Sequence, residues 1–183
     1  MSSLSDRLRD LGVQVGARNL PPAQAKNNNG IEHLFAGVTE STIYGDAYYI
    51  PHRHDLHEPY GNTPLHSIST PELIAAWANE PDLVNCSAAD FAFLDTETTG
   101  LSGGAGVLAF MVGIARFRPD HLEIRQYFLR EAGEETAMLA AISSYLAGAK
   151  AIVTFNGKAF DLPIMLNRAI ITRIGNPFQG LMH

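Results

Sequence analysis

Two acidic residues, separated by a single position, follow an apolar run near the middle of the sequence. Residues 93–100 are Phe-Leu-Asp-Thr-Glu-Thr-Thr-Gly, in which Asp95 and Glu97 are the acids. Residues 91–94 are apolar without alternation, which predicts a central strand covered on both faces. Side chains at positions i and i+2 of a strand share one face, roughly 6.6 Å apart along it. Because buried carboxylates are costly unless cations neutralise them, the pair predicts a site for two hard divalent cations, Mg²⁺ or Mn²⁺, that would cleave phosphate esters.

The same spacing occurs at Glu80 and Asp82, within Asn-Glu-Pro-Asp. This second pair lies in a polar segment with proline, which predicts a solvated turn. Short spacings of this kind arise by chance, so context has to separate them. Only the Asp95–Glu97 pair ends an apolar run, and it alone is a candidate site.

A third acid follows another short apolar run. Residues 151–155, Ala-Ile-Val-Thr-Phe, predict a strand that ends at the turn signal Asn156-Gly157. Helical spacing then predicts a helix over 159–172, with Asp161 in its first turn. An acid there complements the helix dipole, which explains Asp161 without any chemistry. Beside the Asp95–Glu97 pair, however, Asp161 becomes a third candidate metal ligand at the carboxyl end of a strand.

Two motifs in the sequence resemble those of the DEDD exonucleases, a superfamily with a ribonuclease H-like fold. Residues 93–101 are similar to the first motif, and residues 156–161, Asn-Gly-Lys-Ala-Phe-Asp, are similar to the second. The surrounding residues 101–113 and 126–130 more closely resemble the YprB-type bacterial ribonuclease H-like proteins. The resemblance covers about residues 88–183.

This resemblance implies a metal-dependent nuclease, a 3′–5′ exonuclease that hydrolyses single-stranded DNA or RNA with two metal ions. It implies that Asp95 bridges both metals, that Glu97 holds the metal that activates water, and that Asp161 supports the second metal. Nucleic-acid contacts would come from Thr98, which would touch the terminal nucleotide, and from Asn156 and Phe160, which would shape the pocket.

The family also has a third motif, a Tyr or His followed by a final Asp, and this sequence has none. The sequence ends at Leu181-Met-His183, where relatives would begin another strand. We therefore expect a ribonuclease H-like fold truncated at its carboxyl-terminal end, and little or no activity from these 183 residues. The alternative is a non-catalytic nucleic-acid-binding or assembly module with the same fold. The three acids favour the enzyme, because a decayed site has no reason to retain buried acids.

Composition points to a single domain with an extension. The 183 residues are 46% hydrophobic, enough for a proper core. The single cysteine, Cys86, excludes a disulfide framework, fits a reducing compartment and is expected in the core. The first ten residues lack the apolar segment of a signal peptide, and the longest apolar run, 107–115, is about half of the ~20 residues that a membrane span needs. A cytoplasmic protein without membrane association is expected.

The net charge of −6 is distributed unevenly. Residues 31–100 contain eleven acids and one base, whereas residues 101–183 contain eight bases and six acids. The half with the second motif is therefore mildly positive, and bound divalent cations would add to this. No strongly basic stripe is present, so we expect weak and salt-sensitive contact with duplex phosphates.

The chain is expected to comprise three parts: residues 1–30 with a helix over 3–12 and a flexible linker, an amino-terminal extension over 31–88, and a ribonuclease H-like domain over 89–183. Within the extension we expect a strand over 42–50 and a helix over 71–79 that Thr70 caps. The domain should contain strands over 91–96, 107–117, 122–129 and 151–155, with helices over 134–146 and 159–172. This order predicts an α/β fold, a mixed sheet flanked by helices.

Two further features are expected to be structural. His52, His54 and His57 lack a second cluster of Cys or His, so they are interpreted as polar loop residues rather than zinc ligands. Residues 102–106, Ser-Gly-Gly-Ala-Gly, lack the Lys-Ser/Thr of a phosphate loop and predict a flexible connection beside the active site.

Overall fold

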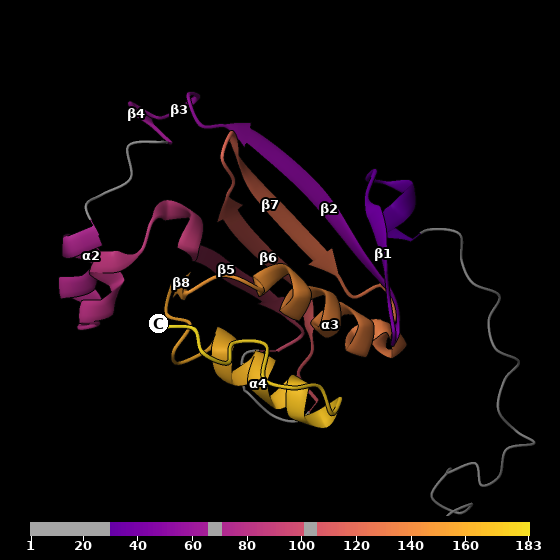
Figure 1. Cartoon of the computed structure of the whole chain (residues 1–183). Helices are drawn as coiled ribbons and strands as arrows, with labels where there is room; N and C mark the ends of the chain where they lie inside the picture. The colour runs from indigo at the N-terminus through magenta and orange to yellow at the C-terminus, as the bar shows by residue number, and fades with distance from the viewer. Residues whose placement is uncertain (1–29, 66–70, 101–105) are drawn as a thin grey trace, which may run out of the picture.

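Six strands form one sheet in the order β1-β2-β7-β6-β5-β8 in the computed structural model, which describes residues 30–65, 71–100 and 106–183 (Figure 1). A separate two-stranded sheet pairs β3 with β4. In chain order the elements are η2 (Ile31–His33), β1 (Val38–Thr42), β2 (Gly45–Asp55), β3 (Pro59–Tyr60), β4 (Thr63–Pro64), α2 (Pro71–Ala78), η3 (Pro81–Asn85), η4 (Ala88–Asp90), β5 (Phe91–Thr98), β6 (Ala109–Phe117), β7 (His121–Phe128), η5 (Ala132–Glu134), α3 (Glu135–Leu146), β8 (Ala151–Thr154) and α4 (Asp161–Ile171).

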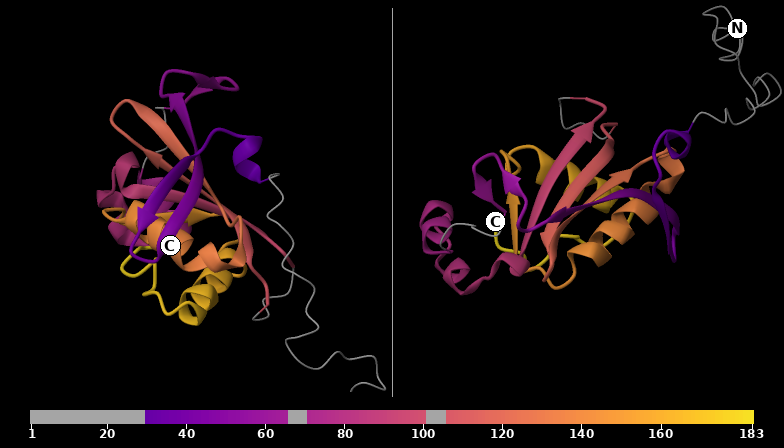
Figure 2. Two further views of the ribbon diagram at one scale, coloured as in Figure 1. Left: turned by 90° about the vertical axis from the view of Figure 1, so that its right-hand side faces the viewer. Right: turned by 90° about the horizontal axis from the view of Figure 1, so that it is seen from above.

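The sheet is mixed, which confirms the predicted α/β class. Strands β1, β2, β7, β6 and β5 are successively antiparallel, and β8 pairs with β5 in parallel. Strands β5 and β8 can pair in parallel because α3 lies between them in the order of the chain. The crossover through α3 returns the chain to the end of the sheet where β5 begins. The strands fan out as a twisted sheet when seen from two other sides (Figure 2). Strands β1 and β2, from the predicted amino-terminal extension, belong to this same sheet.

Helices α3 and α4 lie side by side against one face of the sheet (Figure 1). The core here joins apolar side chains of alternate strand positions to those of the two helices, among them Leu94, Val112, Ile114, Leu139, Ile142 and Met165. The inward side of α3 is as predicted, with Leu139, Ile142 and Leu146 all buried. The helix ends where Arg116 donates to the carbonyl oxygens of Tyr145 and Ala147, at 2.8 and 3.0 Å.

Helix α2 and η3 pack against the opposite face, beside β8 and the start of β5. A second and smaller core forms there from Ala75, Leu83, Cys86, Phe91 and Ala151. The two cores lie on opposite faces because successive residues of β5 alternate between them. The prediction that Cys86 is a small core residue is confirmed, since its relative exposure is 4%.

Most predicted elements of the second half agree with the structure. The hairpin of β6 and β7 is closed by the amide of Arg118, which donates to the carbonyl of His121 at 2.8 Å. Helices α3 and α4 and strand β8 begin and end within two residues of the predicted positions. The predicted helix over 3–12, the cap Thr70 and all but the final glycine of the linker and of the 102–106 connection lie outside the described residues.

The predicted strand over 42–50 is wrong in its bounds, because a hairpin turn interrupts it. Strand β1 ends at Thr42 and β2 begins at Gly45. Gly45 has φ +115°, a conformation that favours glycine. The hydroxyl of Thr42 donates to the carbonyl of Gly45 at 2.8 Å and accepts from the amide of Tyr44 at 3.1 Å. The β-branched and aromatic residues of this stretch are typical of a strand, and so they do not reveal the turn.

The prediction of loop histidines is also wrong for His52 and His54, which lie within β2 and pair with Ile124 and Leu122 of β7. Among the described residues, only β7 borders this part of β2, because β1 pairs with β2 no further than Tyr49. Beyond Tyr49 the strand is therefore an edge strand, where proline and exposed polar side chains are tolerated.

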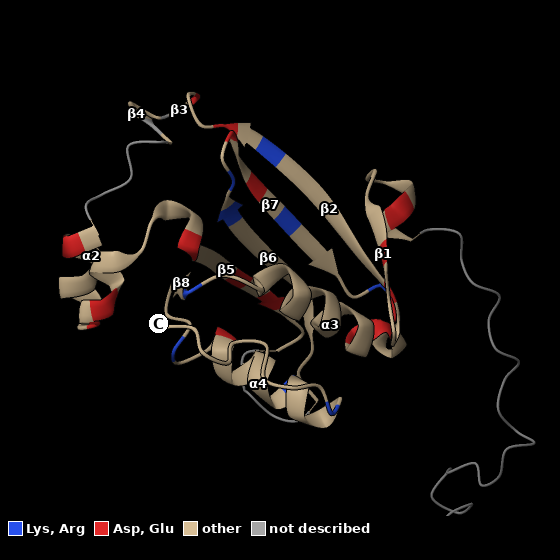
Figure 3. Ribbon diagram, viewed as in Figure 1, with Lys and Arg blue, Asp and Glu red and all other residues tan. Residues whose placement is uncertain are grey.

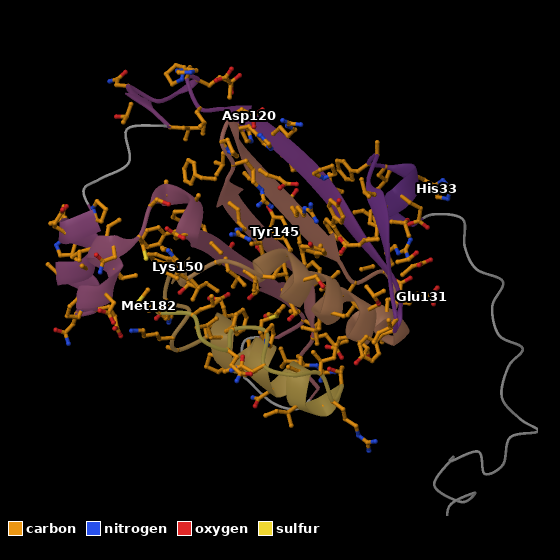
Figure 4. All side chains as sticks on the ribbon, viewed as in Figure 1. His33, Asp120, Glu131, Tyr145, Lys150 and Met182 are labelled. Carbon is orange, nitrogen blue, oxygen red and sulfur yellow. The ribbon has the colours of Figure 1, made fainter. Side chains whose placement is uncertain are left out.

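The last residues of the chain reach the free edge of β8. The amide of Met182 donates to the carbonyl of Lys150, and the amide of Ile152 donates to the carbonyl of Met182, at 2.9 and 2.8 Å. Figure 4 shows Lys150 and Met182 close together at this edge. Met182 thereby forms a parallel bridge with Ala151. No helix among the described residues is long and apolar enough to cross a membrane.

A buried ion pair fixes α4 against α3. Nε and a terminal nitrogen of Arg168 both donate to the carboxylate of Glu135, each at 2.6 Å. Relative exposures are 9% for Arg168 and 5% for Glu135. Hydrogen bonding to this carboxylate raises the pKa of Arg168. A bidentate contact of this kind determines orientation as well as distance, so the pair holds the second half of α4 against the start of α3.

Arg168→Leu should destabilise the protein by about 3–5 kcal/mol, because it leaves the carboxylate of Glu135 buried without its partner. The double variant Glu135→Leu/Arg168→Leu should recover most of this loss, since it removes both charges. Urea unfolding followed by circular dichroism measures both changes. Values for the single variant within 1 kcal/mol of wild type would contradict the structural role of the pair.

Candidate metal and nucleic-acid site

Asp95 and Glu97 share one face of β5, as predicted, but they are exposed rather than buried. Along the strand, Leu94 and Thr96 are buried, whereas Asp95 and Glu97 are solvent-exposed. The prediction that both faces of this strand are covered is therefore wrong at its carboxyl end. Neither negative charge is buried in this arrangement, and both carboxylates are accessible to cations in the solvent.

The exposure has a simple cause in the packing of α2 and η3. These elements cover the acid-bearing face only at the beginning of β5, where Phe91 is buried and Phe93 is half-buried. Further along the strand the same face borders an open hollow of about 690 Å³, lined by residues that include Asp95, Gly113, Val153 and Phe155. The acids therefore stand at the end of an apolar surface, next to space that a ligand can enter.

These two acids lack the partners that other acids of the domain have. Within the part of the chain that the structure describes, neither Asp95 nor Glu97 forms an ion pair. Four other acids of the domain are matched with bases: Asp90 with Lys150, Glu123 with Arg118 and Arg125, Glu134 with Arg130, and Glu135 with Arg168. Figure 3 shows basic residues on β2, β6 and β7, whereas acidic residues predominate around α2. Two neighbouring carboxylates without a base repel each other, and a bound cation would relieve this.

Asp161 is the first residue of α4, and it lies on the other side of β5. It is buried, with 3% relative exposure, and its Oδ1 accepts a hydrogen bond of 2.5 Å from the hydroxyl of Thr96. Thr96 stands between the two acids in the sequence, so its side chain points to the helix face of the sheet. The predicted third ligand is therefore adjacent to the acidic pair along β5 but separated from it by the strand itself.

The residues between β8 and α4 form a tight turn that sets the start of this helix. Asn156 has φ +58°, a left-handed conformation that asparagine tolerates better than most residues. Gly157 follows, and a side chain there would collide with the side chain of Thr154. The hydroxyl of Thr154 accepts from the amide of Gly157 at 3.1 Å. Only glycine fits this position, so the local structure of the turn requires glycine at 157.

The residues predicted to contact nucleic acid occupy two places around these acids. Thr98, half-buried at the end of β5, donates through its hydroxyl to the carbonyl of Gly100 at 2.9 Å. Asn156 is exposed, and Phe160 is half-buried immediately before α4. Asn156 lines a pocket of about 360 Å³ between α2, β8 and the last residues of the chain. Thr98 therefore lies near the acids along β5, while Asn156 and Phe160 belong to the turn that leads to Asp161.

His183 adjoins this turn at the end of β8. Its Nε2 lies 2.8 Å from the hydroxyl oxygen of Thr154. Burial lowers the pKa of this histidine, and the nearby positive charge of Lys158 lowers it further. The imidazole is therefore favoured in its neutral form, as an acceptor or donor to Thr154.

The carboxylates match a hard divalent cation in chemistry but not in position. Their oxygens are the ligands that Mg²⁺ and Mn²⁺ prefer, and Asp95 and Glu97 are accessible to them. Among the described residues, however, no group of three or more His, Cys, Asp or Glu lies close enough to enclose a metal ion. The three acids thus do not form a metal cage in this arrangement, because Asp161 begins α4 on the far side of the strand, where it accepts from Thr96.

Thr96 is the residue that the sequence analysis missed. The acids on either side of it predicted a metal site, whereas threonine is common in strands and by itself predicts no function. The signal was the alternation of β5: Ala92, Leu94 and Thr96 share the face that packs against the helices, so the hydroxyl of Thr96 had to find a polar partner there. The identity of that partner, 65 residues further along the chain, is not readable from the pattern.

Comparison with known proteins agrees with this fold. A family model described as the RNase_H superfamily matches residues 92–183, half of the chain. The protein is also 36% identical over 132 residues to the uncharacterized protein YprB of Bacillus subtilis (strain 168). That alignment covers 69% of this chain and 30% of YprB, so the chain spans under a third of the length of this relative. With its mixed sheet, flanking helices and acidic strand end, the chain belongs to the ribonuclease H superfamily.

Proposed function

We propose that the protein is a metal-dependent nuclease of the DEDD type, which releases nucleotides from the 3′ end of single-stranded DNA or RNA by phosphodiester hydrolysis. The observation behind this proposal is the pair of exposed and unpaired carboxylates, Asp95 and Glu97, at the carboxyl end of β5. Nuclease chemistry is consistent with the superfamily to which the chain belongs. The proposed cofactor is a pair of Mg²⁺ or Mn²⁺ ions.

The electrostatics of the acidic pair support this cofactor. Two like charges on neighbouring positions of one strand face favour binding of a cation, and the described residues provide no Lys or Arg beside them that would serve instead. Divalent cations bound there would activate water and neutralise charge on a phosphate. We propose that Asp95 and Glu97 bind them directly, and that Asp161 is the third acid of the site.

The residues around the acids would then position a nucleic-acid strand. Thr98 is proposed to contact the terminal nucleotide together with the backbone beside it. Asn156 and Phe160 are proposed to shape the pocket for this nucleotide. Lys158, exposed in the same turn, provides a positive charge for the phosphate backbone.

One observation favours a second candidate function, a non-catalytic module that binds nucleic acid or assembles with other proteins. Asp161 is separated from the acidic pair by the strand in this structure, so the acids are not gathered as a catalytic site requires. The two functions differ in their response to metal. A nuclease needs its acids for both metal binding and hydrolysis, whereas a binding module retains single-strand binding when its acids are neutralised.

Mn²⁺ should bind to the wild-type protein with an affinity that Asp95→Asn reduces at least tenfold, because this variant removes one negative ligand from the pair. Isothermal titration calorimetry at fixed pH measures this. Asp82→Asn is the matched control, since Asp82 belongs to an acidic pair with the same spacing but on an exposed 3₁₀ turn. Equal Mn²⁺ affinity in wild type and Asp95→Asn would show that the pair does not bind metal.

Asp95→Asn should leave the metal-free stability unchanged within about 0.5 kcal/mol, because the side chain is exposed and unpaired. Thermal unfolding in the presence of a chelator measures this. A loss of several degrees in the melting temperature would contradict the exposed position of Asp95, and would also make any loss of function in this variant ambiguous.

Hydrolysis of single strands by the 183-residue chain should be slow, because the three acids are not gathered around one point. End-labelled single-stranded DNA and RNA, incubated with Mn²⁺ and resolved on a sequencing gel, should nevertheless shorten progressively from the 3′ end. Asp95→Asn and Asp161→Asn should each reduce the rate at least 100-fold, equivalent to about 2.7 kcal/mol of barrier, while Asp82→Asn should not. Metal-independent strand binding without hydrolysis in all of these proteins would favour the binding module.

A further inference from the structure

The pocket of about 360 Å³ between α2, β8 and the last residues of the chain has a lining of two kinds (Figure 1). Apolar side chains of α2, η3, β5 and β8 form one part, and it includes Leu83 and Phe91 of the smaller core. Polar residues of the turn after β8 and of the chain end form the other part: Asn156, Lys158 and His183. An apolar pocket with a few polar groups is the usual form of a site for a small organic group.

Trp77 is an aromatic side chain of α2 that lines this pocket without being buried. Its relative exposure is 78%, and in the described part of the chain neither its ring nor its indole N–H has a partner. Helix α2 packs on the smaller core through Ala75, together with the half-buried Ile74 and Ala78, so this packing does not depend on Trp77. An exposed indole beside a pocket provides a surface on which a flat aromatic group can stack.

The charge of the lining indicates which aromatic group would fit. Lys158 is the only Lys, Arg, Asp or Glu among the described residues that line the pocket, and it forms no ion pair with any of them. Burial lowers the pKa of His183, so its imidazole is favoured in the neutral form. A lining with an indole on the wall of α2 and a single ammonium group after β8 matches a flat aromatic ligand that carries a negative charge at one end. A nucleobase with its phosphate has this chemistry.

The pocket lies on the same face of the sheet as the exposed acids. Phe91, which lines it, and Asp95 are four residues apart on β5, so their side chains share one face, roughly 13 Å apart along the strand. Strand β8 runs parallel to β5, with Ala151 paired to Phe91, and therefore leads from the pocket toward the end of the sheet that carries the acids. A nucleic-acid strand can pass from the acids to the pocket without crossing the sheet.

We propose that this pocket holds an unpaired base of a single-stranded nucleic acid, which stacks on Trp77 while the adjoining phosphate contacts Lys158. The inference deepens the proposed function and rests on it for the choice of ligand. A base that is paired and stacked within a duplex cannot enter the pocket, so the pocket selects single strands. Binding should be weak and sensitive to salt, because one lysine provides the attraction while α2 and η3 carry acids outside the lining (Figure 3).

Trp77 is the only tryptophan of the chain, so tryptophan fluorescence reports on this pocket alone. Titration of the wild-type protein with a single-stranded oligonucleotide, at low salt and with a chelator to prevent hydrolysis, should quench the emission until the site is saturated. A strand of the same length without bases retains the phosphates and should leave the emission unchanged, and a duplex of the same sequence should quench it far less. The strand is used as DNA and as RNA, and saturation at the lower concentration identifies the preferred sugar.

Fluorescence anisotropy of a labelled single strand measures the effect of substitutions. Trp77→Ala should weaken binding roughly tenfold or more, as expected for loss of one stacked base, and Trp77→Phe should weaken it less because an aromatic face remains. Tyr44→Ala is the matched control, since Tyr44 is also an exposed aromatic residue but lies between β1 and β2 at the opposite edge of the sheet. Lys158→Gln should reduce both the affinity and its salt dependence. Arg173→Gln, which removes an exposed charge beyond the end of α4, should change neither.

The outcomes separate this inference from the proposed function. A strand that binds without quenching, or that binds Trp77→Ala as tightly as wild type, would overturn the base pocket and leave the nuclease proposal intact. Equal quenching by the strand without bases, or an equal loss of affinity in Tyr44→Ala, would overturn stacking on Trp77 as well. Quenching by single strands that are not hydrolysed when Mn²⁺ is added would contradict the nuclease and retain the pocket. Absence of any strand binding at low salt would contradict both the pocket and a nucleic-acid ligand.

Discussion

The alternation of side chains along β5 is the constraint on which the rest of the structure depends. This strand lies between β6, to which it is antiparallel, and β8, to which it is parallel. Its even-numbered positions up to Thr96 face α3 and α4 and are buried, so the acids between them are directed to the opposite face. One strand therefore contributes both to the main core and to the candidate site, and a shift of register by a single residue would exchange the two.

Helices α3 and α4 both pack against the same face of β5. The buried pair of Glu135 and Arg168 joins the start of α3 to the second half of α4, and Thr96 contacts Asp161 at the start of α4. Helix α2 and η3 protect the other face near Phe91 but do not reach Asp95. Asp95 and Glu97 are therefore in contact with solvent, whereas Asp161 is buried on the other face of β5, beside Thr96, the residue between them. Such an arrangement differs from a rigid metal cage, in which all ligands point to one place before the metal arrives.

The charge of the molecule is consistent with a site that depends on cations. The overall net charge is −6, and the bases of the β6–β7 hairpin are engaged within the protein. Arg118 and Arg125 both pair with Glu123, and Arg125 also lies over the rings of Tyr49 and Tyr145. Arg116 donates to the carbonyls of Tyr145 and Ala147. These bases stabilise the sheet and its packing against α3 rather than present a charged surface for phosphates. Under the proposed function, a polyanionic substrate would be attracted by bound metal ions and by Lys158 near the end of β8.

Apolar periodicity, turn residues and helix signals are local, so the sequence predicted the mixed α/β sheet, the order of the elements in its second half and the three candidate acids. It also determined that Asp95 and Glu97 share a face, since the period of a strand is two. The burial of that face and the partner of Asp161 were decided only by the tertiary structure. Burial depends on how far α2 extends over the sheet, and the contact between Thr96 and Asp161 depends on α3 and β8 bringing together residues that are 65 positions apart. The hairpin at Thr42–Gly45 and the edge position of His52 and His54 were likewise hidden, because strand neighbours distant in the sequence, not the residues themselves, make a position an edge or a centre.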